Sequence, residues 1–370
     1  MIRLSKSTIT ETEKSAVMEV LDREYLGMGQ EVLQFEERLT DFFGRPAICV
    51  VNGTAALHLA CQAVGIKSDD EVLVPSLTYV ASFQAISATG AKPVACDIDA
   101  DTLTFNWKDA EKRLTNKTKA IMTVHYAGGV GDIDSIYSFA NQYGLRVIED
   151  AAHAFGSTHN GVRVGGFGDI ACFSFDGIKN ITSGEGGCIV TDDDLVIKKI
   201  RDARLLGVEN DTSRRYSGER SWDFDVSSQG WRYHMSNIMA AIGLEQLRRF
   251  PDLKNKRQLL ARRYDLLLSK NAAIISLKHD YSNIVPHIYV VRFKGLLNRE
   301  ALREAMLGAG IQTGVHYKPN HLLSMYQKIG VLPLTITESI YPTLITLPLH
   351  TDMSESDVDF VCEKLTTFIK

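Results

Sequence analysis

Lys179 is the residue of this sequence best placed to do covalent chemistry. It lies in the stretch 173–187, where an apolar run leads to a lysine flanked by small, polar and glycine residues, and a second apolar run, 188–190, follows. Burial between two strands disfavours the charged form of a lysine and leaves a neutral amine available. A neutral, positioned amine is the group that forms a Schiff base with a carbonyl. The alternative is a strand end whose lysine reaches out to solvent.

A second candidate group ends a short apolar strand in the segment 146–157. Glu149 and Asp150 end this predicted strand, and small residues and His153 follow. An acid at the carboxyl end of an inner strand points into the crevice where α/β sheets bind ligands. A carboxylate there can keep a pyridine nitrogen protonated, as pyridoxal 5'-phosphate (PLP) requires to act as an electron sink. The alternative role for Asp150 is to cap the next helix.

A third candidate is a strand that runs through Asn52, Gly53 and Thr54 directly into an alanine-rich helix. The first amides of a helix are unpaired, and its positive dipole end favours an anion. Gly53 allows close backbone approach, and the Thr54 hydroxyl can donate to a phosphate oxygen. An ordinary helix start has the same pattern. A phosphate loop, a strand-end aspartate and a buried lysine, in this order along an alternating α/β chain, are far more specific than any one of them.

These segments carry a resemblance to a known family over nearly the whole chain. The sequence resembles the DegT-like sugar aminotransferases, a branch of the aspartate aminotransferase fold (PLP fold type I). The matching motifs are 52–55, 75–79, 149–153, 174–187 and 316–317. The resemblance implies a homodimer with PLP bound covalently to Lys179. The remaining cofactor contacts that it implies are Asp150 at the pyridine nitrogen, His153 near the phenolate oxygen, Tyr79 stacked on the ring, and Thr54, Ala55 and Ser174, beside Gly53, at the phosphate.

Substrate contacts are expected from two further segments. By resemblance, Glu185 in the Gly-Glu-Gly-Gly run lines the sugar site, although it could be a solvated turn residue. His316 and Tyr317 are placed where a small domain closes over substrate, although such pairs also occur in cores. His125, at the end of a predicted strand, could face the crevice or be a satisfied structural histidine.

The sequence departs from the family pattern in the segment 230–237. Family members often have Gly-aromatic-Asn-Tyr-Arg-Met here, and their asparagine crosses the dimer interface to the partner's PLP phosphate. This chain has Arg232 at that position and His234 in place of the arginine. An arginine can pair bidentately with phosphate, so Arg232 could keep the role. The exchange at position 234 puts a substrate contact from there in doubt.

Composition limits the classes of partner. The 370 residues include 41 Lys plus Arg against 45 Asp plus Glu, so nucleic acid is not an expected ligand. The six cysteines form no Cys-x-x-Cys pair, which argues against a disulfide frame or a zinc site and favours a reducing compartment. No apolar stretch is long enough to cross a membrane. We therefore expect a cytoplasmic protein with neither a metal nor a membrane partner.

The order of elements predicts an α/β fold with a mostly parallel, doubly wound sheet. Short apolar strands are expected at 47–51, 71–74, 92–96, 120–124, 146–148 and 170–175, with helices between them. Strand 188–190 follows closely enough to be antiparallel. The run 210–215 is the best candidate for a flexible loop. We expect a large domain over 1–250 and a small α+β domain over 251–370, with strands at 283–293, 310–316 and 345–348 and a helix break at Pro251.

The expected reaction is transfer of an amino group from glutamate to a keto-sugar. Members of the family with Gly-Glu-Gly-Gly after the lysine resemble enzymes that aminate C4, whereas those with Gly-Asp-Gly-Gly more often resemble the C3 group. By this resemblance, Glu185 favours C4 of a nucleotide-linked 4-keto-6-deoxyhexose for cell-surface polysaccharide or lipopolysaccharide, with dTDP, GDP or UDP as the nucleotide. A C3 keto-sugar and a free keto-sugar acid are alternatives. A PLP-dependent sugar dehydratase is disfavoured by Lys179 and the scattered cysteines, and an amino-acid aminotransferase by the lack of a convincing motif around Arg292, Arg299 or Arg303. A non-enzymatic regulator that keeps the fold is a further alternative.

Overall fold

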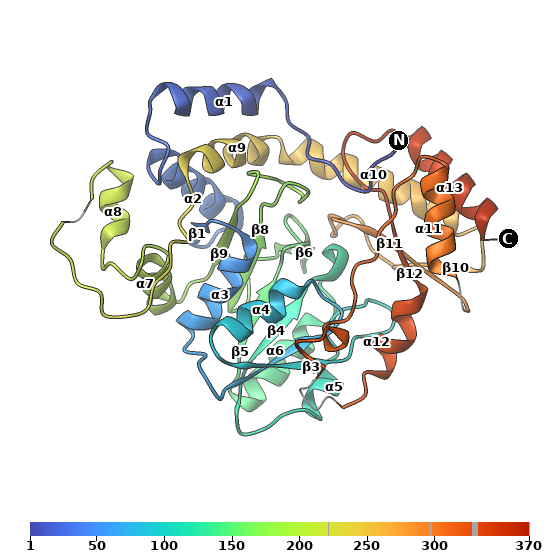
Figure 1. Ribbon diagram of the computed structural model, residues 1–370, viewed down its shortest axis with the longest axis horizontal. Coiled ribbons are helices and arrows are strands. Elements are labelled where there is room, and N and C mark those ends of the chain that lie inside the picture. The colour runs from blue at the N-terminus through green and yellow to red at the C-terminus, as the bar shows by residue number, and fades with distance from the viewer. Residues whose placement is uncertain (221, 296–297, 328–331, 370) are drawn as a thin grey trace.

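The computed structural model describes residues 1–220, 222–295, 298–327 and 332–369. Within these ranges, the larger part of the molecule is built on a seven-stranded sheet, at the left and centre of Figure 1. The strands lie side by side in the order β1-β9-β8-β5-β4-β2-β3. Their bounds are β1 Ala47–Val50, β2 Glu71–Pro75, β3 Lys92–Cys96, β4 Thr118–Val124, β5 Arg146–Asp150, β8 Ile170–Ser174 and β9 Gly187–Val190.

The direction of the strands follows the prediction. Pairing is parallel from β8 through β5, β4 and β2 to β3. Strand β9 alone among these runs against its neighbours, because it pairs antiparallel with both β1 and β8. The mostly parallel sheet with one antiparallel strand is thus confirmed, and the turn between β8 and β9 is the one that carries Lys179.

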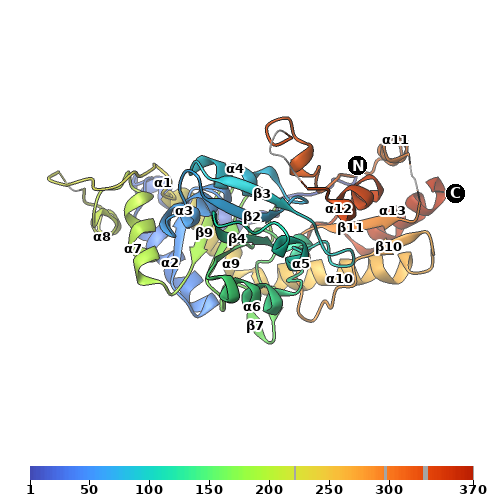
Figure 2. The same cartoon turned by 90° about the horizontal axis from the view of Figure 1, so that it is seen from below.

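Helices cover both faces of this sheet, as a doubly wound fold requires (Figures 1 and 2). Alternate residues of β1 show the reason: Ala47 and Cys49 join one apolar core, and Ile48 and Val50 join the other. The first core is closed by α2 Gln30–Phe43, α5 Trp107–Glu111, α6 Ile133–Tyr143 and α9 Asn237–Arg248. The second is closed by α3 Gly53–Ala63, α4 Val80–Ala88 and α7 Asp194–Ala203. A capping box at Thr10 starts α1 Glu11–Asp22, and a small hairpin is formed by β6 Thr158–His159 and β7 Val162–Arg163.

A second, antiparallel sheet lies at the right of Figure 1, near both chain ends. It consists of β10 Ile274–Ser276, β11 Tyr289–Phe293 and β12 Leu344–Leu347, and it packs with α10 Phe250–Leu268, α11 Arg299–Gly308 and α13 Glu355–Phe368. Two segments connect the part built on the large sheet with the part built on the small sheet through hydrogen bonds. Leu4 O accepts from Leu349 N of the small part, and Asp97 of the large part accepts from the first amides of α12 Thr335–Ile340. We keep residue 250 as the proposed domain boundary, because the two sheets lie on opposite sides of it in the chain.

Several element predictions need correction. The run 210–215, expected to be a flexible loop, forms most of the helix α8 Asp211–Tyr216, in which Arg215 pairs with Asp211 one turn away. The segment 310–316 is not a continuous strand, because its partners on either side meet it only at isolated bridges at Ile311 and Gly314. Of 283–293, only β11 is strand, and β10 was not predicted. The break at Pro251 is confirmed, since α9 ends at Arg248 and Pro251 lies in the first turn of α10.

Candidate active site

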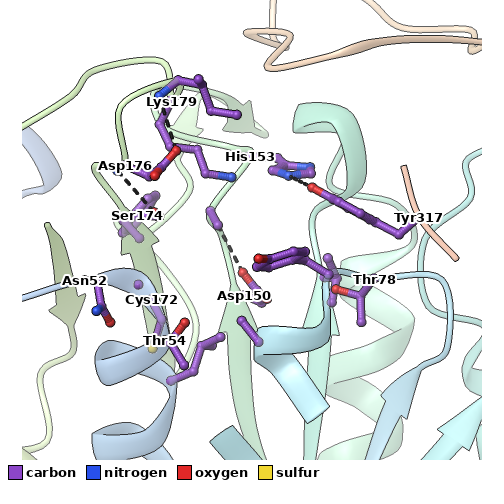
Figure 3. A pocket seen from close by; sticks show the side chains of 18 of the residues that line it. Asn52, Thr54, Thr78, Asp150, His153, Cys172, Ser174, Asp176, Lys179 and Tyr317 are labelled. Carbon is purple, nitrogen blue, oxygen red and sulfur yellow. Dashed lines mark hydrogen bonds between the residues drawn. The ribbon is translucent and has the colours of Figure 1, made fainter. Parts of the chain in front are cut away.

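A cavity of about 420 Å³ opens at the carboxyl ends of β4, β5 and β8 (Figure 3). Segments far apart in the chain line it: the start of α3, the loop before α4, the end of β5, the turn between β8 and β9, and residues 316–317. Ten of the residues predicted from the sequence line this cavity. They are Gly53, Thr54, Tyr79, Asp150, His153, Ser174, Lys179, Glu185, His316 and Tyr317.

Lys179 projects into the cavity from the turn that follows β8. Asp176 builds this turn: its carbonyl accepts from Lys179 N at 3.0 Å, and its carboxylate accepts from Ile178 N at 3.2 Å. Burial lowers the pKa of Lys179 to about 8, against the opposing pull of the Asp150 and Asp176 carboxylates. The neutral amine is therefore far more populated at neutral pH than in an ordinary lysine.

Asp150 lies across the cavity from Lys179, at the end of β5. Its carboxylate accepts from Ser82 Oγ at 2.7 Å and from Ala152 N at 3.3 Å. Burial raises the pKa of Asp150, and these hydrogen bonds oppose that shift. The carboxylate is thus aimed by β5 and by the first turn of α4. Ser82, on α4, was not predicted as a site residue.

A buried hydrogen-bond network lies behind Asp150. The His125 imidazole lies 2.6 Å from a Glu149 oxygen, and Tyr137 Oη donates to the other oxygen at 2.6 Å. His125 and Glu149 are fully buried, and His125 does not line the cavity. His125 is therefore a structural histidine, which was one of its two predicted roles. Its backbone N also donates to Asp150 O at 3.1 Å, so the network holds the end of β5 in place.

The start of α3 offers a site for an anion. Asn52 Oδ1 caps the helix by accepting from Ala55 N at 2.8 Å, which leaves the preceding amides of Gly53 and Thr54 without a hydrogen-bond partner among the described residues. A Cβ on Gly53 would come within 2.8 Å of Ser174 Cβ, so only glycine allows β8 and α3 to approach this closely. Free amides, two hydroxyls and a helix dipole converge here, as phosphate binding requires.

Aromatic side chains form the opposite wall. His153 Nε2 lies 2.9 Å from Tyr317 Oη, and its Nδ1 accepts from Ala127 N at 3.3 Å, which places the ring proton on Nε2. The Tyr79 ring lies 5.6 Å from that of Tyr317 and is 58% exposed. His316 Nδ1 lies 2.8 Å from Thr346 Oγ1 of β12. This wall therefore comes partly from the segment that connects β11 and β12 of the smaller sheet.

One residue next to Lys179 was missed by sequence reasoning. His287 Nε2 lies 3.4 Å from Lys179 Nζ, and the His287 ring centroid is 4.5 Å from that of His153. His287 precedes β11, in a stretch that we predicted only as strand. It is 108 positions from Lys179 in the chain, and no local motif marks it.

Comparison with known proteins places this geometry in a family. The model of the DegT/DnrJ/EryC1/StrS aminotransferase family matches residues 7–366. The chain belongs to this family. The spore coat polysaccharide biosynthesis protein SpsC of Bacillus subtilis is 36% identical over 371 residues, which cover 98% of this chain and 95% of SpsC.

Solved structures of similar proteins share the fold. The putative sugar aminotransferase Spr1654 from Streptococcus pneumoniae, in its PMP-form, superimposes with a TM-score of 0.92 at 32% identity, over 99% of this chain and 98% of that one. Helicobacter pylori PseC, an aminotransferase involved in the biosynthesis of pseudoaminic acid, gives 0.91 at 28% identity, over 99% and 98% of the two chains. This member of the DegT/DnrJ/EryC1/StrS family is a PLP-dependent sugar aminotransferase.

The residues present fit the cofactor. A free lysine amine, a buried strand-end carboxylate and a cradle that a Cβ at Gly53 would fill converge in one cavity. Two predicted contacts lie elsewhere in this single chain. The Ala55 amide already donates to Asn52, and Ala55 does not line the cavity. Arg232 is exposed to solvent and does not line the cavity, and its backbone forms an isolated β-bridge with Leu205.

The segment around Arg232 is nevertheless tied to the phosphate cradle. Tyr233 O accepts from Val51 N at 2.7 Å, directly before Asn52, and Tyr233 N donates to Arg204 O at 3.0 Å. His234 follows, and burial, together with the neighbouring arginines, lowers its pKa to about 4.

Glu185 lies on the cavity rim in the turn before β9 and is exposed. Partial burial of its carboxylate and the nearby Asp176 carboxylate raise its pKa.

In the part of the chain that the structure describes, no helix is long and apolar enough to cross a membrane.

Proposed function

We propose that this enzyme transfers an amino group from glutamate to C4 of a nucleotide-linked 4-keto-6-deoxyhexose. The observation that carries the chemistry is the cavity in which Lys179, Asp150 and the free amides of α3 converge. Glu185, on the rim of that cavity in a Gly-Glu-Gly-Gly turn, favours C4. The naming of SpsC for spore coat polysaccharide biosynthesis supports a role in making a cell-surface sugar.

The chain's own residues would divide the work as follows. When bound, PLP supplies a conjugated ring that delocalises the electron pair left when a proton leaves the donor Cα. Lys179 would hold the cofactor, and its amine, once released, would take that proton from the donor Cα and deliver it to the C4′ carbon of the cofactor. Asp150 keeps the pyridine nitrogen protonated through its buried carboxylate. The phosphate would be held by the Gly53 and Thr54 amides and by the Thr54 and Ser174 hydroxyls. His153 would lie at the phenolate oxygen, and Tyr79 would lie against the ring.

Substrate contacts are proposed at the open side of the cavity. Glu185 lines it there from the turn before β9, and His316 and Tyr317 line it from the segment between β11 and β12. A carboxylate and two polar rings can hydrogen-bond the hydroxyl groups of a sugar. The same residues would also suit a C3 keto-sugar or a free keto-sugar acid, which remain the second candidates.

An amino-acid acceptor is a weaker candidate. Such a substrate needs an arginine for its α-carboxylate. Arg292 donates to Ala100 O, Arg299 donates to Tyr341 O, and Arg303 pairs with Glu300. No arginine is among the described residues that line the cavity.

The proposal includes a homodimer with shared sites. Trp222, Phe224 and Val226 are exposed apolar residues between α8 and Arg232, and a second copy of the chain would cover them. Arg232 would then reach the partner's PLP phosphate. A cytoplasmic location is proposed as well, since the six cysteines are buried and unbridged.

The test is a substrate screen with the PLP-loaded enzyme and glutamate. The acceptors are dTDP-, GDP- and UDP-linked 4-keto-6-deoxyhexoses, their 3-keto isomers and free keto-sugar acids. Mass spectrometry and NMR identify the amino sugar and its position, and Lys179→Ala is the control. Amination at C3, or of a free acid alone, would contradict the C4 proposal. Loss of an oxygen without gain of nitrogen would indicate a dehydratase, and failure of borohydride to fix PLP on the chain would favour a regulator.

A further inference from the structure

His287 contacts the reactive amine, yet the roles proposed above do not include it. Its Nε2 lies 3.4 Å from Lys179 Nζ, and its side chain is only 3% exposed. The His153 ring packs on it with a centroid separation of 4.5 Å. A buried imidazole packed in this way has little freedom to rotate, so the contact is a property of the folded core and not a chance meeting of mobile side chains.

A single arginine ties the backbones of His287 and Lys179 together. Arg257 of α10 is 3% exposed, and it donates to His287 O at 3.1 Å, to Leu349 O at 3.4 Å and to Lys179 O at 3.5 Å. Three chain segments from the two sheets thus meet on one guanidinium. The distance between the imidazole and the amine is therefore set by the backbone as well as by side-chain packing.

The surroundings of His287 keep its ring neutral. Burial lowers its pKa well below the usual value, and its main titratable neighbours, Lys179, His153, Arg257 and His316, are all bases, so none favours a charged imidazole. A neutral imidazole that carries its proton on Nδ1 offers Nε2 as an acceptor, whereas an ammonium group can only donate. While Lys179 is an ammonium group, the lysine therefore donates and His287 Nε2 accepts.

We propose that His287 is a positioning residue that accepts a hydrogen bond from the Lys179 amine whenever that amine is not bonded to PLP. This rests on the proposed function, in which Lys179 leaves the cofactor and returns to it during each reaction cycle. A fixed acceptor gives the freed amine one resting place, from which it can reach the same reacting atoms each time.

The test measures the protonation of Lys179 in the PLP-free protein. Pulse labelling with acetic anhydride between pH 6 and pH 10, followed by peptide mass spectrometry, gives the pKa of this one lysine. His287→Leu removes the acceptor and should lower that pKa by about one unit, a tenfold change in the protonation constant. His287→Gln, whose amide oxygen can accept at a similar reach, should restore most of the shift. The other charged or titratable groups that act on Lys179 are Asp150, Asp176, His153, His316 and Arg257, and all remain in both variants.

His350→Leu is the matched control. His350 is 6% exposed, so it is buried nearly as fully as His287. It does not line the cavity, so its loss should leave the pKa of Lys179 unchanged. An unchanged or raised pKa in His287→Leu would overturn the proposal, and so would a fall that glutamine does not reverse.

A second measurement covers the case in which the leucine variant fails to fold. Covalent capture of PLP by the PLP-free protein, followed by absorbance, should be several-fold slower in His287→Asn, whose shorter side chain cannot reach Nζ, and near normal in His287→Gln. Equal rates in these two variants would overturn the proposal. If Lys179 of the unaltered protein captures no PLP, the proposed function fails, whereas the acetylation titration still decides the role of His287.

Discussion

Lys179 and Asp150 face one cavity, and burial moves the pKa of each toward neutrality. The pKa of the amine falls to about 8 and the pKa of the carboxyl rises. Each charge opposes the shift of the other, because an ammonium and a carboxylate across a cavity favour each other's charged forms. A pyridinium bound between them would replace the lysine as the partner of Asp150, which frees the amine to act as a base.

The pH dependence of PLP capture tests the state of Lys179. With a pKa of about 8, the neutral fraction rises about tenfold between pH 7 and pH 9 and then levels off. An unshifted lysine would gain about a hundredfold over that range without levelling off. Stopped-flow absorbance of the PLP-free protein mixed with PLP gives the rate, and Nα-acetyl-lysine in parallel corrects for the ionisation of PLP. A rate still climbing steeply above pH 9 would contradict the lowered pKa.

Asp150→Asn tests the carboxylate. The variant should fold and keep some cofactor but lose turnover on the order of a hundredfold or more, because an amide does not hold the ring nitrogen protonated. Asp176→Asn is the matched control: asparagine can keep the turn at Ile178, and a much smaller loss is expected. Steady-state kcat with circular dichroism and cofactor absorbance checks this. A near-normal kcat in Asp150→Asn would refute the role.

The residues that the sequence predicted at the site share one property: each lies in a short local motif. A lysine between apolar runs, an aspartate at a strand end and Asn-Gly-Thr before a helix can be recognised without knowing what is opposite them. Ser82 and His287 could not be found in this way. Ser82 is 68 positions from Asp150 and His287 is 108 from Lys179, so tertiary packing alone brings them together.

At the scale of elements, the phosphate cradle depends on how closely α3 approaches β8. The sequence predicted the strands of the large sheet because they are short and apolar on both faces. It failed at 310–316, which meets the N-terminal segment and β12 only at isolated bridges, without a continuous ladder. It also failed at α8, whose helix is stabilised by contacts such as that of Tyr216 with the buried Arg204. These outcomes depend on partners distant in the chain.

Gly53→Ala tests the close approach at the cradle. The new Cβ would lie 2.8 Å from Ser174 Cβ, so the helix start must move away from β8. We expect a loss of about 1–3 kcal/mol in the free energy of unfolding and PLP binding weakened about tenfold or more. Gly308→Ala is the control, because its Cβ meets open space at the end of α11, and it should leave both quantities nearly unchanged. Equal effects of the two variants on PLP affinity would contradict the cradle.

A buried ion pair holds the elements around the cradle. Arg204, with no exposed surface, donates to Glu36 of α2 and to Cys49 O of β1, and its carbonyl binds Tyr233. Glu36→Leu leaves this guanidinium without a carboxylate, and we expect a loss of about 3–5 kcal/mol in the free energy of unfolding. Asp41→Ala, in the exposed pair with Arg38 on the same helix, should change it by less than about 1 kcal/mol. Urea unfolding measures the free energy of unfolding of both variants. Comparable losses would show that burial of the ion pair does not determine how much it stabilises the fold.

At the scale of the whole molecule, residues from both the large and the small part of the chain line the cavity, which remains open on one side. Residues 316–317 reach it from the segment between β11 and β12 of the small part, and Arg257 bonds to backbone of both parts. Arg232 does not reach this cavity within its own chain, although its segment is pinned to the end of β1. If Arg232 serves a site at all, that site belongs to a second copy of the chain.

Mixed dimers of two impaired variants test this arrangement. Arg232→Ala should weaken PLP binding by about 1.5–3 kcal/mol, as expected for the loss of a hydrogen bond to a charged group, and Lys179→Ala should abolish turnover. In a mixed dimer, one site inherits both defects, and the other combines an intact Lys179 with the partner's intact Arg232. Each mixed dimer should therefore regain roughly half the activity of a wild-type dimer at limiting PLP, because its second site is complete. Subunit exchange is followed with two affinity tags, and activity is measured on the doubly tagged fraction. Absence of recovery in that fraction would mean that Arg232 serves its own subunit's site or none.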